Sequence, residues 1–153
     1  MDRLDLTILA ELQRDSRQSI SDIADRAGLS LSACHRRIKL LESEGAITGY
    51  GARLDPQALG LEIEVFAEIS LTSQHYSALE EFEQAVLGHN EILECKLTTG
   101  AHDYILRVVA KDVTDYDRIH RNVLSALPGV ASMRSIFALR TIKSWKGLPL
   151  SRR

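Results

Sequence analysis

Residues 28–42 read GLSLSACHRRIKLLE, and this stretch decides the fold of the N-terminal part of the chain. Gly28 is suited to ending one helix, and Ser30 is suited to capping the next. An α-helix would place the apolar residues of the stretch on one side and Arg36 on the other. The apolar side consists of Leu31, Cys34, Ile38 and Leu41. The stretch therefore predicts a turn followed by an amphipathic helix with one apolar and one basic side.

Two shorter helical patterns precede this stretch, and a different pattern follows it. Apolar residues recur at helical spacing from Leu4 to Leu12. A second run, which buries Ile20, Ile23, Ala24 and Ala27, can be capped by Ser19 or Ser21. The segment from Ile47 to Leu54 is rich in β-branched, aromatic and glycine residues, which predicts a short twisted hairpin. Three helices and a hairpin are the elements of a winged helix-turn-helix, whose last helix enters the major groove of DNA.

The composition is that of an ordinary globular protein. The chain has 153 residues, of which 44% are hydrophobic and 26% charged, and its formal net charge is −2. No apolar stretch approaches the roughly 20 residues that span a bilayer, and the N-terminus lacks a signal-peptide core, so we expect a cytoplasmic protein. Cys34 and Cys95 form no CxxC pattern, which favours two reduced thiols over a disulfide framework or a zinc ribbon.

Beyond Leu61 the apolar residues no longer recur at helical spacing but at every second position. Ile63 to Leu71 alternates apolar with polar residues, as a half-buried strand does. Two helices and three further strands follow, and the resulting order, strand, helix, strand, strand, helix, strand, is that of the ferredoxin-like split βαβ fold. The helices are expected at 76–86 and 114–127, and the strands at 92–99, 104–110 and 130–139.

The predicted fold class is therefore α+β, with two domains. Residues 1–55 form a winged helix-turn-helix domain, 56–61 a linker, and 62–153 a ferredoxin-like βαββαβ domain. The five histidines show no HxH or HExxH spacing, and no glycine-rich phosphate loop occurs. We accordingly expect no enzyme, no catalytic residue, no metal site and no cofactor. A ferredoxin-like enzyme would need a converging acid–base pair, which the sequence does not offer.

The sequence resembles the Lrp/AsnC family of leucine-responsive, or feast/famine, transcription regulators in two motifs. The first is the stretch 28–42 continued by GAITGY at 45–50, and the second is GAHDY at 100–104, which fits the family's GxxDY signature. The resemblance ends at Ile142-Lys143 and so covers essentially the whole chain. Leu31 departs from the family, whose members often carry proline there. Because leucine is a good helix former, we expect little effect on the fold.

The basic side of the third helix is the predicted DNA-binding surface. Three positive charges and no acid lie between Ser30 and Leu41. The residues expected to contact DNA are Ser30, Ser32, Ala33, His35, Arg36, Arg37 and Lys39. A basic C-terminal tail is a second, weaker indication of a DNA partner, and it consists of Arg140, Lys143, Lys146, Arg152 and Arg153. The alternative is a solvated basic side with no nucleic-acid partner.

The resemblance implies that the second domain, called RAM in this family, dimerises sheet against sheet. It also implies larger rings, commonly octamers, with an amino-acid effector bound between dimers. Glycine in the GxxDY loop permits a left-handed turn or close backbone approach, and Asp103 can pair with a ligand ammonium. The implied effector-binding residues are Leu97, Thr99, Gly100, Ala101, His102, Asp103, Tyr104, Val113, Ser135 and Ile136. The alternatives are a plain hairpin turn capped by Asp103, and a regulator that responds to no small molecule.

Together these features predict a sequence-specific DNA-binding transcription regulator. The resemblance implies a role at genes of amino-acid metabolism, and two-fold symmetry implies a near-palindromic site. The alternative from another class is a stand-alone amino-acid-binding or assembly module whose helical half docks a protein instead of DNA.

Overall fold

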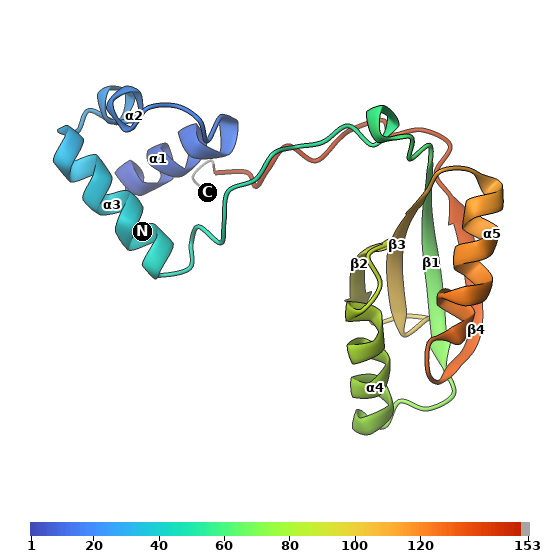
Figure 1. Cartoon of the computed structure of the whole chain (residues 1–153). Coiled ribbons are helices and arrows are strands. Elements are labelled where there is room, and N and C mark those ends of the chain that lie inside the picture. Colours follow the sequence, from blue (N-terminus) through green and yellow to red (C-terminus); the bar gives the residue numbers. More distant parts are fainter. Residues whose placement is uncertain (151–153) are drawn as a thin grey trace. The chain divides into compact units, whose positions relative to one another are not determined.

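Residues 1–150 are described by a computed structural model in which the chain divides into two units (Figure 1). The first unit comprises Met1–Arg53 together with the C-terminal segment from Lys143 onward, and the second comprises Leu54–Ile142. Each unit has an apolar core of its own. No helix among the described residues is both long and apolar enough to cross a membrane.

Three helices make up most of the first unit, and they begin and end where the sequence predicts. They are α1 (Arg3–Arg14), α2 (Ile20–Ala27) and α3 (Leu31–Ser43). The hydroxyls of Ser19 and Ser30 each accept a backbone N–H three residues ahead, which caps α2 and α3. Gly28 ends α2 with a φ of +66°, in the left-handed region that favours glycine.

The core of the first unit fixes the rotation of α3 about its own axis. Cys34 is fully buried, and Ile38 and Leu41 are nearly so. These side chains pack with buried residues of the other two helices, among them Ile8 of α1 and Ile23 of α2. Three of the four residues of the predicted apolar side therefore face α1 and α2, whereas Leu31, at the start of the helix, is 57% exposed. The side of the helix opposite Cys34 is also left exposed.

The predicted hairpin at 47–54 does not form. The amide N–H of Ile47 donates to the carbonyl of Leu41 at 3.1 Å, which closes the end of α3. Beyond it, within the described part of the chain, the backbone up to residue 55 pairs with no strand. Gly49 and Gly51 leave the segment with few side chains to pack, and its arms are too short to hold a hairpin without an apolar surface beneath them.

The C-terminal segment contacts the end of α1. The side-chain amide of Gln13 donates to the carbonyl of Leu148 and accepts the N–H of the same residue, both at 2.8 Å. Arg53 donates to the backbone carbonyls of Gln13 and Lys146. Gly147 has a φ of +118°, and a Cβ there would collide with the Gln13 side chain. This segment falls in the predicted second domain, whereas its contacts in the structure are with the first unit.

The second unit is an antiparallel sheet with two α-helices, which confirms the ferredoxin-like prediction. The strand order is β2-β3-β1-β4, and every neighbouring pair is antiparallel. The helix predicted at 114–127 ends earlier, at Asn122, and a 3₁₀ turn follows it. The elements are a 3₁₀ turn (Gln57–Leu59), β1 (Ile63–Leu71), α4 (Tyr76–Leu87), β2 (Ile92–Leu97), β3 (Tyr104–Ala110), α5 (Val113–Asn122), a second 3₁₀ turn (Leu124–Ala126) and β4 (Val130–Phe137).

Helices α4 and α5 cover one face of the sheet and leave the other face without a helix (Figure 1). On the covered face, the strand residues Val65, Ala67 and Ile69 are fully buried. Their neighbours along β1 point to the other face because side chains alternate along a strand. That helix-free face presents Phe66, Ile105 and Ile136, each about two-fifths exposed or slightly less. Apolar side chains therefore lie on both faces of the sheet.

Candidate DNA interface and effector site

The exposed side of α3 carries most of the predicted DNA-contacting residues. Ser32, His35, Arg36 and Lys39 are all exposed. At about 100° per residue, Arg36 lies about 160° from the buried Cys34 and so points directly away from the core. Of the other predicted residues, Ala33 is half-buried, and the Ser30 hydroxyl accepts the amide N–H of Ala33. This side of α3 is positively charged, has short side chains near its N-terminus, and has a shape that can enter a DNA groove.

Arg37, another of the predicted DNA-contacting residues, forms ion pairs with α1. Its guanidinium forms ion pairs with Asp2 at 2.9 Å and with Asp5 at 2.7 Å, and so ties α3 to the N-terminus of α1. These two carboxylates raise the pKa of Arg37, with Asp5 the larger cause. Arg37 lies only about 60° from Cys34 around the helix, so its side chain emerges next to the core. The angular positions on a helical wheel are thus enough to distinguish Arg37, which lies beside the core, from Arg36, which points away from it.

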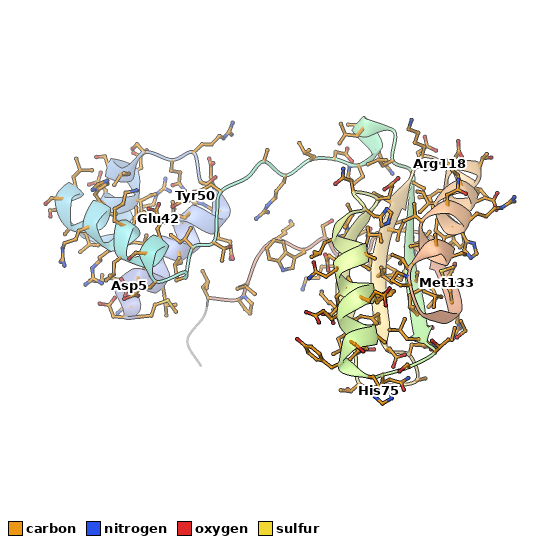
Figure 2. All side chains as sticks on the ribbon, turned by 60° about the horizontal axis from the view of Figure 1, so that its bottom comes forward. Asp5, Glu42, Tyr50, His75, Arg118 and Met133 are labelled. Carbon is orange, nitrogen blue, oxygen red and sulfur yellow. The ribbon has the colours of Figure 1, made fainter. Side chains whose placement is uncertain are left out.

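Lys39 is also paired, by a residue that the sequence analysis did not weigh. Its ammonium lies 2.8 Å from Oε2 of Glu42, one turn further along α3, while Oε1 of Glu42 accepts the hydroxyl of Tyr50 at 3.0 Å. Figure 2 shows Glu42 and Tyr50 side by side. Lys39 is the main cause of the lowered pKa of Glu42, whereas burial, followed by Glu42, raises the pKa of Tyr50 to about 12.

Arg36 differs from its two basic neighbours. No carboxylate pairs with its guanidinium anywhere in the described part of the chain. Of the basic tail, Arg140, Lys143 and Lys146 are exposed, and Arg152 and Arg153 lie outside the described residues.

We predict that Arg37→Ala lowers the melting temperature more than Arg36→Ala does, because only Arg37 joins α3 to α1. The pKa of Asp2 is lowered from its ordinary value of 3.8, first by the N–H of Asp5 and then by Arg37. A depressed carboxyl pKa stabilises the fold above pH 4, and this stabilisation is lost as pH falls below that value. Thermal melts from pH 7 to pH 3 should therefore show the wild-type advantage over Arg37→Ala shrinking at the acid end. Equal melting temperatures of the two variants at pH 7 would contradict this role.

In the second unit, the GxxDY loop is anchored to β1 through Asp103. One carboxylate oxygen, Oδ2, accepts the amide N–H of Leu71 at 2.7 Å, and Oδ1 lies 3.4 Å from the side-chain nitrogen of Gln74. The backbone N–H of Asp103 donates to the carbonyl of Ile69. Within one chain Asp103 thus positions the loop, as in the turn-capping alternative, and Oδ1 has only the long contact with Gln74.

Glycine at position 100 has no left-handed φ, contrary to one of the two expected uses. A Cβ at this position would also meet no atom within 4 Å. Nothing in the described part of the chain therefore explains why a glycine stands there.

His102 connects the loop to the helix-free face of β1. Its Nδ1 shares a hydrogen bond with the hydroxyl of Ser70 at 3.1 Å, and its Nε2 lies 3.2 Å from Oε2 of Glu68. Arg134 of β4 approaches the same carboxylate oxygen at 3.7 Å. The sequence analysis missed Glu68 and Ser70, although their i, i+2 spacing on β1 places them on one face. These residues form a half-buried polar cluster beside the loop.

The remaining predicted effector residues do not converge within one chain. Ser135 bonds to the Tyr116 hydroxyl on the helix-covered face, whereas Ile136 points to the other face. Val113 begins α5, just beyond the end of β3 that is opposite the loop. Tyr104 is buried, and its hydroxyl donates to Glu83. Burial and then Glu83 raise the pKa of Tyr104 above its usual range. Leu97, Thr99 and Ala101 are exposed beside the loop.

Comparison with known domain families matches both units. A winged helix-turn-helix DNA-binding model matches residues 1–48, and the Lrp/AsnC ligand-binding domain matches residues 64–148. The chain belongs to the Lrp/AsnC family. As a family member it is a transcriptional regulator with a helix-turn-helix DNA-binding domain and an Lrp/AsnC ligand-binding domain.

Whole-length relatives agree with this assignment. The chain is 41% identical over 150 residues to the Bkd operon transcriptional regulator of Pseudomonas aeruginosa, and the match covers 98% of each protein. It is 37% identical over 153 residues to the leucine-responsive regulatory protein of Escherichia coli, across its own full length and 93% of that protein. These Lrp/AsnC relatives are transcriptional regulators.

Solved structures of the family share the fold. An AsnC family transcriptional regulator from Agrobacterium tumefaciens is 36% identical, with a TM-score of 0.93 over 98% of this chain and 97% of that one. A transcriptional regulator from Neisseria meningitidis, solved as a complex with L-Met, is 33% identical, with a TM-score of 0.92 over the same shares.

Proposed function

We propose that this chain is a cytoplasmic, sequence-specific repressor or activator of amino-acid metabolism genes, controlled by an amino-acid effector. The observation that carries the proposal is the exposed, basic side of α3, held outward by the buried Cys34, Ile38 and Leu41. We place the DNA-binding domain at 1–55, the linker at 56–61 and the effector domain at 62–153, with the C-terminal segment resting on the first unit.

The proposed DNA surface consists of the side chains that project from α3 away from the core. Arg36 reads a base edge or a phosphate, and Ser32 lies one turn before it, where a short side chain lets the backbone approach DNA. Lys39 contacts the phosphate backbone, and His35 lies at the margin. Ala33 and Ser30 support the helix start. Arg37 acts as a positioning residue through its ion pairs with α1.

We predict that Arg36→Ala weakens specific DNA binding by about 1–3 kcal/mol, because an unpaired guanidinium is lost from the centre of the surface. A gel-shift titration at fixed salt measures the change. Arg121→Ala on α5 is the matched control, since it removes the same charge from an exposed helix of the other unit. Equal affinity of Arg36→Ala and the control would remove Arg36 from the interface.

The proposed assembly begins with a dimer formed through the helix-free face of the sheet. Phe66, Ile105 and Ile136 lie on that face, and a second copy would remove them from water. Face-to-face packing of two sheets is a common solution for such a surface. A two-fold dimer presents two α3 helices to successive major grooves, and further assembly to an octamer would place several DNA surfaces on one particle.

We predict that Ile136→Glu dissociates the dimer, because a carboxylate would be buried in an apolar sheet–sheet contact. Size-exclusion chromatography with light scattering measures the mass. Leu87→Glu is the control, since Leu87 is 78% exposed at the end of α4, away from that face. A dimer that survives Ile136→Glu unchanged would place the interface elsewhere.

The proposed effector is a free amino acid bound where the GxxDY loops of two dimers meet. A family relative has been solved with L-Met, which supports this ligand class. In this chain, Oδ1 of Asp103 can accept an ammonium, and the open position at Gly100 admits a ligand close to the backbone. The residues implied by the resemblance are scattered in one chain, which agrees with a site completed by a second dimer.

We predict that Asp103→Asn loses amino-acid binding but keeps the fold, because asparagine can still accept the Leu71 N–H. A hydrogen bond to a charged group contributes about 1.5–3 kcal/mol, so affinity should fall at least about tenfold. A thermal-shift screen against the common amino acids identifies the ligand. At 100 times its Kd, a ligand adds about 2.7 kcal/mol to the free energy of unfolding. The control is Glu62→Gln, an exposed acid of the same unit. Wild-type affinity in Asp103→Asn would move the site away from this loop.

A further inference from the structure

The basic side of α3 is less positive in the folded chain than its sequence indicates. Of the three cations on this helix, Arg37 is paired with Asp2 and Asp5, and Lys39 is paired with Glu42. Of these three cations, Arg36 alone has no carboxylate partner among the described residues. The two ion pairs lie on different sides of the helix. Arg37 emerges beside the core, whereas Lys39 lies on the exposed side, with 64% of its side chain accessible.

Glu42 is held in position from both sides. Its Oε2 lies 2.8 Å from the ammonium of Lys39, and its Oε1 accepts the hydroxyl of Tyr50 at 3.0 Å. Tyr50 follows the end of α3, and Figure 2 shows its ring beside the Glu42 carboxylate. Both oxygens of this carboxylate are therefore engaged, and its side chain is only 28% exposed. An ordinary surface glutamate has no second contact that fixes its direction.

A DNA phosphate and the Glu42 carboxylate need the same partner. Both are oxygen anions that accept hydrogen bonds from an ammonium. The pair with Glu42 takes one of the three N–H donors of Lys39 and offsets its positive charge, which weakens any contact of Lys39 with a phosphate. Glu42 also adds a negative charge on the side that would face the DNA backbone. Phosphate contacts carry no sequence information, so this competition weakens binding to every DNA sequence by a similar factor.

We propose that Glu42, fixed by Tyr50, competes with the DNA backbone for Lys39 and thereby limits the sequence-independent part of DNA binding. This inference rests on the proposed DNA surface of α3. It assigns Glu42 the role of a positioning residue that sets how many phosphates the helix neutralises, while Arg36 is left free for the groove. Because the factor is similar for every sequence, Glu42 lowers the absolute affinity for DNA and leaves the ratio of specific to random affinity unchanged.

Glu42→Gln tests the proposal in the full-length protein. Glutamine has the same shape and can still accept the Tyr50 hydroxyl, so the fold should be kept. We expect binding to tighten by about three-fold or more on both a specific and a random duplex. We also expect the slope of log affinity against log salt to steepen by about 0.9, the value for one additional phosphate neutralised. Glu44→Gln is the matched control, because Glu44 is an exposed acid two residues away with no contact to Lys39.

The same substitution in a Lys39→Gln background separates competition from general repulsion. If Glu42 acts through Lys39, the gain from Glu42→Gln should largely vanish when the lysine is absent. An undiminished gain in that background, or a gain no larger than that of Glu44→Gln, would overturn the proposal. Arg36→Ala distinguishes this failure from failure of the proposed surface, since weakened binding in that variant shows that α3 still contacts DNA.

Discussion

Cys34, Ile38 and Leu41 anchor α3 in the core of the first unit, and the direction of every side chain on the proposed DNA surface depends on that burial. A helix with three fixed apolar contacts cannot rotate about its axis. Each polar residue therefore has a set direction, with Arg36 pointing outward and Arg37 pointing toward α1. The Gly28 turn and the Ser30 cap decide where the helix begins, and the core decides which side it shows.

Ion pairs then distinguish the three cations of α3 from one another. A count of charges along α3 treats its three cations as equivalent, but each has a different surrounding in the folded chain. Arg37 joins two helices, Lys39 is shared with Glu42, and Arg36 has no carboxylate partner among the described residues. On the proposed DNA surface, α3 would combine a fixed contact with α1 through Arg37, a phosphate contact through Lys39 and a groove contact through Arg36.

Much of this was predictable from the sequence, and the exceptions have physical causes. The helices, their caps and the βαββαβ order follow from apolar spacing and from local signals such as Gly28 and Ser30. The prediction of a hairpin at 47–54 was wrong, because a composition rich in β-forming residues does not supply a strand to pair with. The contacts of Asp103 with Leu71 and of His102 with Glu68 join distant positions, which spacing along one strand does not reveal. The residues that the resemblance implies for an effector site are scattered in one chain, and only an assembly of several chains could bring them together.

We propose that this Lrp/AsnC protein binds specific DNA as a symmetric particle through α3. The most direct measurement is selection of bound sequences by the full-length protein from a pool of random duplexes. We expect enrichment of a near-palindromic site whose half-sites lie about one helical turn, or a whole number of turns, apart. Recovery of no preferred sequence, with binding that follows salt alone, would contradict it.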